Sequence, residues 1–221
     1  MPSPRYDALQ QAAEAAGLIV MGALDVASAR PKGLEDGTLM LFGAGPGFWP
    51  AFTASPEWAD GAPDPIDRWS TRVIGALARN HGGVPHFPFG GPPYTPFIDW
   101  ALKSGRAVQS PVGMLVHDRV GMMISYRGAL HWPAERFALP PAPASSPCEG
   151  CVDRPCVTAC PVGALAGDHG YDVPRCHAFL DQPEGKSCML QGCAVRRACP
   201  VSRGAERPAA QSALHMRSFH R

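Results

Sequence analysis

Hydrophobic positions near the N-terminus follow helical spacing first and strand spacing next. One apolar face repeats at helical intervals until Gly17, a residue suited to ending a helix. The short apolar runs Leu18–Leu24 and Thr38–Phe42 then predict two buried strands. The residues of the helical face are Tyr6, Leu9, Ala13 and Ala16.

The pattern continues with two further helices and a hairpin. Asp67 can cap a helix over Arg68–Arg79, and a second helix is expected over Pro96–Lys103. Val112–Val116 and Val120–Tyr126 predict a hairpin that turns at residues 117–119. Inward positions of the first of these helices are Trp69, Val73, Ile74 and Leu77. The pattern predicts an α+β domain over residues 1–138 with a sheet of four or five strands.

Cysteine distribution divides the rest of the chain. All eight cysteines lie between Cys148 and Cys199, and residues 1–147 contain none. Residues 139–147 form a proline-rich linker, residues 148–200 a cysteine module, and residues 201–221 a basic tail. The module is therefore expected to be a small domain of its own.

Charge and hydropathy exclude several classes of protein. The formal net charge is only +1, which provides no broad electrostatic footprint for nucleic acid. The longest apolar run, Leu18–Leu24, is about a third of the ~20 residues that a membrane span needs. The amphipathic N-terminus lacks the early apolar core of a secretory signal. We therefore expect a cytoplasmic protein with no membrane partner, whose reduced and clustered thiols bind metal.

The spacing within the module indicates iron–sulfur ligands. Its first half has the spacing C-x2-C-x4-C-x3-C-P from Cys148 to Pro161, and its second half also ends in Cys-Pro, at Cys199 and Pro200. In two-cluster bacterial ferredoxins the last cysteine of such a run ligates the other cluster. A following proline favours a break in the chain, so the cysteine can turn away from its own loop.

Eight thiolates supply two sets of four, enough for two [4Fe–4S] clusters. We expect crosswise ligation, in which the last cysteine of each half binds the cluster of the other half. A zinc ribbon built on Cys148 and Cys151 is the alternative, but it explains neither the two Cys-Pro endings nor the count of eight. The first predicted set is Cys148, Cys151, Cys156 and Cys199, and the second is Cys160, Cys176, Cys188 and Cys193.

Two stretches before the module resemble known families. Pro96–Gly105 followed by Ser110–Gly121 resembles the part of epoxyqueuosine reductases that precedes their two-cluster ferredoxin module. Cys176–Leu180 resembles the fifth-cysteine region of that module. Asp64–Asp67 together with His117–Gly128 is similar to the cytosolic cobalamin-processing protein family. The order of the two domains also resembles that of reductive dehalogenases.

The resemblance implies a nitroreductase-like fold for the N-terminal domain and a corrinoid bound there. A flavin is the alternative cofactor, because this fold class also hosts flavins. The matched segments make His117, Gly121 and Arg127 the candidates for binding the corrinoid or flavin. Tyr94 and Tyr126 are separate candidates for proton donors, on their chemistry alone.

One departure from epoxyqueuosine reductases narrows the implied function. Those enzymes place a proton-donating Asp just before the proline that opens the helix, whereas residues 90–96 here contain no carboxylate. Reduction of a tRNA base is therefore not expected, and neither is a nucleic-acid partner.

The main functional hypothesis is an iron–sulfur redox protein. It passes electrons from a low-potential donor through two [4Fe–4S] clusters to a corrinoid, as a cobalamin-dependent or cobalamin-processing oxidoreductase. One alternative is a ferredoxin-like carrier whose N-terminal domain binds a protein partner and no organic cofactor. The other alternative is a zinc-stabilised binding protein.

Overall fold

A computed structural model describes residues 1–166 and 170–220. The chain divides into two compact units. The first unit comprises Met1–Ala107 and Ser125–Pro143, and the second comprises Val108–Ile124 and the chain from Ala144 onward. Residues 167–169 of the predicted cysteine module and Arg221 of the predicted tail lie outside the described residues.

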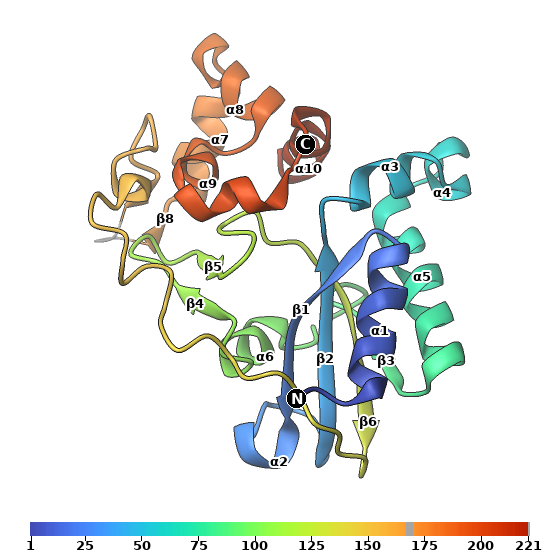
Figure 1. Cartoon of the computed structure of the whole chain (residues 1–221). Helices are drawn as coiled ribbons and strands as arrows, with labels where there is room; N and C mark the ends of the chain where they lie inside the picture. Colours follow the sequence, from blue (N-terminus) through green and yellow to red (C-terminus); the bar gives the residue numbers. More distant parts are fainter. Residues whose placement is uncertain (167–169, 221) are drawn as a thin grey trace. The chain divides into compact units, whose positions relative to one another are not determined.

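A four-stranded antiparallel sheet forms the centre of the first unit (Figure 1). Every residue of β2 (Gly37–Ala44) is buried, so both faces of the sheet are covered at this strand. The sheet order is β1-β2-β6-β3, with β1 at Leu18–Asp25, β6 at Tyr126–Pro133 and β3 at Val84–His86. The two strands predicted at Leu18–Leu24 and Thr38–Phe42 are confirmed.

Two helices of the first unit, α1 (Pro4–Ala15) and α5 (Pro65–His81), contact each other and the sheet. Both lie on the same side of the sheet in Figure 1. The Ser3 side chain caps α1 by accepting a hydrogen bond from the Tyr6 backbone N–H. The remaining helices are α2 (Val26–Ala29), α3 (Phe48–Thr53), α4 (Pro56–Ala59) and α6 (Phe97–Lys103).

The predicted start of α5 is wrong, although its buried face is confirmed. The N-cap is Asp64, which adopts a left-handed conformation with φ of +51° and makes no side-chain cap bond. Asp67 lies in the first turn of α5 instead. Helix entry is set by Pro65, whose fixed φ suits the first helical position. The inward positions Trp69, Val73, Ile74 and Leu77 are all buried.

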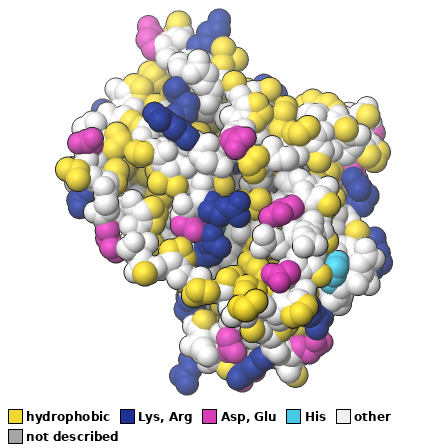
Figure 2. Space-filling model, viewed as in Figure 1, with side chains coloured by type: hydrophobic (Ala, Val, Ile, Leu, Met, Phe, Trp, Pro, Cys, Tyr) yellow, Lys and Arg dark blue, Asp and Glu magenta, His cyan; other side chains and the backbone are white. Residues whose placement is uncertain are grey.

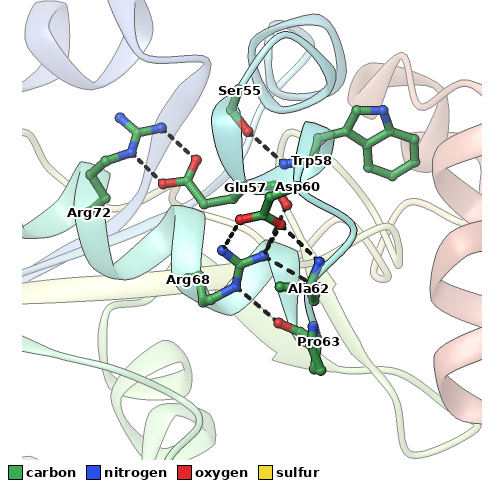
Figure 3. A network of polar contacts seen from close by, with 8 residues as sticks. All are labelled: Ser55, Glu57, Trp58, Asp60, Ala62, Pro63, Arg68 and Arg72. Carbon is green, nitrogen blue, oxygen red and sulfur yellow. Dashed lines mark hydrogen bonds and ion pairs between the residues drawn. The ribbon is translucent and has the colours of Figure 1, made fainter.

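Two ion pairs hold α4 and the loop after it against α5 (Figure 3). Arg72 donates to both carboxylate oxygens of Glu57, at 2.5 and 2.9 Å. Arg68 donates to both oxygens of Asp60 at 2.7 Å. The two hydrogen bonds from Arg72 lower the pKa of Glu57 from 4.5 to about 2, and they outweigh the opposing effect of burial.

The predicted hairpin is wrong. The strand pair consists of β4 (Ala107–Gln109) and β5 (Leu115–His117), and Val120–Ser125 forms no strand. The predicted turn does form, because the backbones of His117 and Gly121 exchange two hydrogen bonds of 2.9 Å. The next strand, β6, begins only at Tyr126, the last residue of the predicted second strand.

Val108–Ile124 belongs to the second unit, where three side chains fasten it to the cysteine-rich part. The Met122 N–H donates to Ser202 Oγ at 3.0 Å, while Arg196 and Arg207 donate to the carbonyls of Met122 and Met123 at 2.6 and 2.7 Å. The buried core of this unit contains Val112, Val116, Met122, Cys156, Leu165, Val195 and Cys199. The prediction that Val108–Ile124 is part of the N-terminal domain is therefore wrong. The contacts that hold this segment join residues far apart in the chain, so no local pattern indicates them.

Short helices and two short strands make up the remainder of the second unit. The 3-10 turns are η1 (Pro155–Val157), η2 (Pro183–Gly185) and η3 (Pro200–Ala205). The α-helices are α7 (Val173–Leu180), α8 (Lys186–Gln191), α9 (Ala194–Ala198) and α10 (Ala209–Phe219). The strands β7 (Leu165–Ala166) and β8 (Gly170–Tyr171) pair antiparallel.

The predicted basic tail is structured. Its residues form η3 and α10, and α10 contacts α8. Gln211, Ser212 and Ala213 of α10 are buried, so this segment contributes to the core of the second unit. The basic residues of this segment predict a solvated tail, whereas its apolar and small residues form a buried helical face.

The mixed α+β class is therefore confirmed. Among the described residues, no helix is both long and apolar enough to cross a membrane. Figure 2 shows acidic and basic side chains interspersed on the face that it presents.

Substitution of Gly121 tests the docking of residues 108–124. A Cβ atom at Gly121 would lie 2.3 Å from the Ser202 backbone N, and the φ of +56° is itself unfavourable. Gly113, with φ of +79° and no heavy atom within 4 Å of a built Cβ, is the matched control. Both alanine variants should lose about 1–2 kcal/mol from left-handed strain. Gly121→Ala should lose about 1–3 kcal/mol more from overlap, measured by urea unfolding. Equal losses would contradict the docking.

The Glu57–Arg72 pair predicts a pH dependence of stability. The pKa of Glu57 is lower in the folded protein, at about 2, than the 4.5 of an unfolded chain. The ion pair therefore stabilises the protein fully above pH 4.5, and this stabilisation is lost as the pH falls toward 2. Between pH 5 and pH 3 the native protein should lose about 1 kcal/mol more stability than Glu57→Gln, measured by circular dichroism during thermal unfolding. Glu184→Gln, which changes an exposed carboxyl of the second unit, should behave like the native protein.

Candidate metal centre

Four cysteines from the two ends of the module line one cavity. The cavity has a volume of about 160 Å³ and contains Cys148, Cys151, Cys156 and Cys199 in its lining. A single water needs about 10–15 Å³ of such space, so the cavity has room for a group of several atoms. These four residues are the predicted first set, and the structure brings them together.

Local structure explains how distant residues reach this cavity. Cys156 lies in η1, which begins at Pro155, and Cys199 lies at the junction between α9 and η3, directly before Pro200. Cys199 has extended dihedral angles, with φ of −64° and ψ of 121°. The residue before a proline is driven to this region, so the chain turns out of α9 at the cysteine.

The walls of the cavity are mostly apolar. Arg154 is the one charged side chain among its described lining residues, and it is exposed. Cys156 and Cys199 are themselves part of the buried core. The apolar lining residues are Pro111, Val116, Met122, Pro147, Pro155, Pro200 and Val201.

Burial and crowding oppose ionisation of the thiols. Burial raises the pKa of Cys148, and the neighbouring thiols of Cys199 and Cys151 raise it further. Burial likewise raises the pKa of Cys156, followed by the effects of Cys148, Cys199 and Cys151. Four thiolates so placed would repel one another, so a cationic group between them would favour their ionised form.

The other four cysteines interact with one another as a second set. Burial raises the pKa of Cys176, and the thiols of Cys193, Cys160 and Cys188 raise it further. The Ala164 N–H donates to Cys160 Sγ at 3.2 Å, and hydrogen bonding with the Tyr171 side chain lowers the pKa of Cys176.

Neither set converges on one point. Within residues 1–166 and 170–220, no group of three or more His, Cys, Asp or Glu side chains is placed to hold a single metal ion. Zinc requires its four ligands within about 2.0–2.3 Å of one atom. In a [4Fe–4S] cluster each of four cysteine thiolates binds a different iron, so its ligands stand farther apart. The cavity and its donor set therefore fit a polyatomic cluster in size and chemistry.

His117 and Gly121 lie at the turn of the second unit. The His117 side chain is completely buried, and its Nδ1 accepts a hydrogen bond of 3.1 Å from the Arg119 backbone N–H. Asp118 Oδ1 also lies 3.1 Å from Nδ1. The imidazole thus supports the turn and presents no exposed surface to a cofactor. Gly121 is required by the close approach of Ser202.

The other candidates lie in the first unit. Arg127 Nη1 lies 3.6 Å from Asp67 Oδ1, its side chain is 15% exposed, and its Nε has no hydrogen-bond partner among the described residues. Burial lowers the pKa of Arg127, and burial raises the pKa of Asp67. Tyr126 is buried beside Phe97, whereas Tyr94 is 67% exposed.

Three features of the centre were missed in the sequence. Tyr171 and Arg196 are polar neighbours of the second set, and Met122 lines the cavity of the first. The spacing of Arg196, three residues after Cys193, could have revealed its position on the same helical face. No local signal marks Tyr171 or Met122.

Comparisons of the chain with known protein families, curated proteins and solved structures find no match. The assignment of a function therefore depends on the arrangement of residues in the two units.

Proposed function

We propose that this protein transfers electrons through two [4Fe–4S] clusters. The observation that carries the proposal is the cavity lined by Cys148, Cys151, Cys156 and Cys199, whose residues come from both ends of the module. Each cluster would accept one electron and pass it on without a bond being formed or broken. The protein would hold the clusters with its thiolates and exclude water with the apolar walls.

The ligand assignment is crosswise in this proposal. Cys199 belongs with Cys148 although it follows the second half of the module, and Cys160 belongs with Cys176 although it follows the first half. The electrostatic neighbours of Cys148 and Cys176 support this division. Both Cys-Pro junctions suit the crosswise assignment, because the proline favours an extended conformation in which the cysteine would turn away from its own loop.

The proposed acceptor is a corrinoid bound by a nitroreductase-like first unit, and the proposed place of action is the cytoplasm. Support for the corrinoid comes from the resemblance of Asp64–Asp67 and of the stretch at residues 117–128 to cobalamin-processing proteins. Arg127 retains a hydrogen-bond donor that suits a corrinoid amide. His117 is buried and engaged at its turn, so we assign it no role as a cobalt ligand.

Metal analysis tests the clusters. Protein purified without oxygen should be brown and contain roughly eight iron atoms and eight inorganic sulfides per chain. A colourless protein that contains zinc and no sulfide would refute the proposal and favour a zinc-stabilised binding protein.

Single cysteine variants test the crosswise assignment. Cys148→Ser and Cys199→Ser should perturb the same electron paramagnetic resonance signal of the reduced protein. Cys160→Ser and Cys176→Ser should perturb the other signal, because each replaces a thiolate of the second cluster. If Cys160→Ser instead alters the signal affected by Cys148→Ser, the two halves bind their clusters independently and the assignment is wrong.

Titration with cobalamin tests the acceptor. Binding should change the visible spectrum of cobalamin, and the corrinoid should stay with the protein during gel filtration. Arg127→Met should weaken retention about tenfold, the value of one charge-assisted hydrogen bond. Arg79→Met, which changes another arginine of the first unit, is the control. If the spectrum does not change and no cobalamin is retained, the ferredoxin-like carrier is the better description.

A further inference from the structure

Two histidines of the second unit face each other through their ring nitrogens. His177 lies on α7, and His220 is the C-cap residue that follows α10. Their Nδ1 atoms lie 2.5 Å apart, and the centroids of the two rings lie 4.8 Å apart. The pair therefore joins two helices through residues that are 43 positions apart in the chain.

A carboxylate orients the second ring of this pair. His220 Nε2 lies 2.9 Å from Asp181 Oδ1, within hydrogen-bonding distance. An ionised carboxylate only accepts hydrogen bonds, so Nε2 carries the proton of a neutral His220 and its Nδ1 directs a lone pair at His177. Histidines that bind metals in proteins are commonly oriented in this way, with the other ring N–H donated to a carboxylate.

An aromatic side chain orients the first ring. Phe219 stacks on the imidazole of His177, with centroids 4.7 Å apart and an angle of 27° between the ring planes. Phe219 also stacks with Tyr171, at a centroid distance of 6.1 Å. Both imidazoles are thus held in place by neighbours, which reduces the entropy lost when a ligand binds between them.

The chemistry of this pair suits a divalent transition-metal ion. Imidazole nitrogen is a favoured ligand of zinc, copper and nickel. Two nitrogens at the usual distance from one tetrahedral ion stand about 3.3 Å apart, so the rings need to separate by about 0.8 Å. His220 has the non-helical dihedral angles φ −117° and ψ 91°, so its ring can make this shift without a change in α10.

Water would complete the coordination of such an ion. No third His, Cys, Asp or Glu side chain of the described residues is placed to complete a metal site with this pair. The His220 side chain is 17% exposed, so solvent reaches the site. In the free protein the Nδ1–H of His177 donates to Nδ1 of His220. On binding, that proton would move to Nε2 of His177, and both Nδ1 lone pairs would become ligands.

We propose that His177 and His220 bind one divalent ion of the zinc and copper class. Asp181 is a positioning residue that acts through His220. The bound ion ties the end of α10 to α7. This site is separate from the eight cysteines, so the inference goes beyond the proposed function and does not require the clusters.

The test is a calorimetric titration of the whole anaerobic protein with zinc, after dialysis to remove loosely bound metal. Iron is measured before and after the titration. The native protein should bind one more zinc per chain than His220→Gln, with no loss of iron. His177→Phe, which keeps an aromatic ring against Phe219, should also lose this zinc. Asp181→Asn should weaken binding at least tenfold, the usual effect of removing a carboxylate that orients a ligand.

Stability provides a second readout of the same site. An ion that binds only the folded chain stabilises it, so saturating zinc should raise the urea midpoint of the native protein. The midpoint of His220→Gln should rise much less. A rise of equal size in both proteins would overturn the inference, because the stabilising zinc would then be bound elsewhere.

Two matched controls test the specificity of the site. His81→Gln changes a histidine of the first unit, and Glu184→Gln changes an exposed carboxyl close to Asp181 in the chain. Both should bind zinc as the native protein does. Equal weakening in Glu184→Gln and Asp181→Asn would refute the positioning role of Asp181.

The remaining outcomes separate this site from the proposed clusters. Equal numbers of bound zinc ions in the native protein and His220→Gln would overturn the inference and leave the electron-transfer function standing. Native protein without iron and sulfide would refute that function, while the difference between native protein and His220→Gln would still report this site. If His177→Phe does not retain its iron, His220→Gln and Asp181→Asn decide the question, because neither residue is adjacent to a cysteine in the chain.

Discussion

Crowding of thiols against apolar walls is the constraint on which the second unit depends. The cavity of Cys148, Cys151, Cys156 and Cys199 has mostly apolar walls, and burial raises the pKa of Cys148 and Cys156. A bound cationic group resolves this conflict, because it converts mutual repulsion among the ligands into attraction to the metal. Metal binding and folding are coupled under such conditions, since the ligands meet only in the folded chain. Clusters bound here would therefore stabilise the fold of the second unit in addition to carrying electrons.

The same constraint explains why residues 108–124 are part of the cysteine-rich unit. The module alone supplies thiols, but much of the apolar wall comes from this separate segment, through Val116 and Met122. Hydrogen bonds from Arg196 and Arg207 hold the segment by its carbonyls, and Gly121 permits the backbone to approach Ser202. Arg196 therefore fastens one wall of the cavity, and its charge also interacts with the thiol of Cys193.

The first unit has a different basis for stability. Its antiparallel sheet is buried along all of β2, and α1 and α5 cover it through ordinary apolar contacts. No metal is needed to explain this packing. The candidate cofactor residues lie in separate surroundings, with Arg127 on β6 in this unit and His117 at the turn of the other. The proposed corrinoid therefore has its support in sequence resemblance and in the spare donor of Arg127, whereas the clusters are supported by an assembled set of side chains.

The sequence alone determined the strands at Leu18–Leu24 and Thr38–Phe42 and the buried face of α5, and it predicts the division of the cysteines into two sets of four. The periodicity of apolar residues indicates the strands and the helix face, and a proline after cysteine indicates where the chain turns. Both signals extend over only a few residues. Tertiary structure decided the placement of residues 108–124, the burial of α10 and the position of Tyr171 beside Cys176. Each of these depends on contacts between residues far apart in the chain. A single sequence carries no pattern for such contacts, because the apolar or polar character of a residue does not specify its partner.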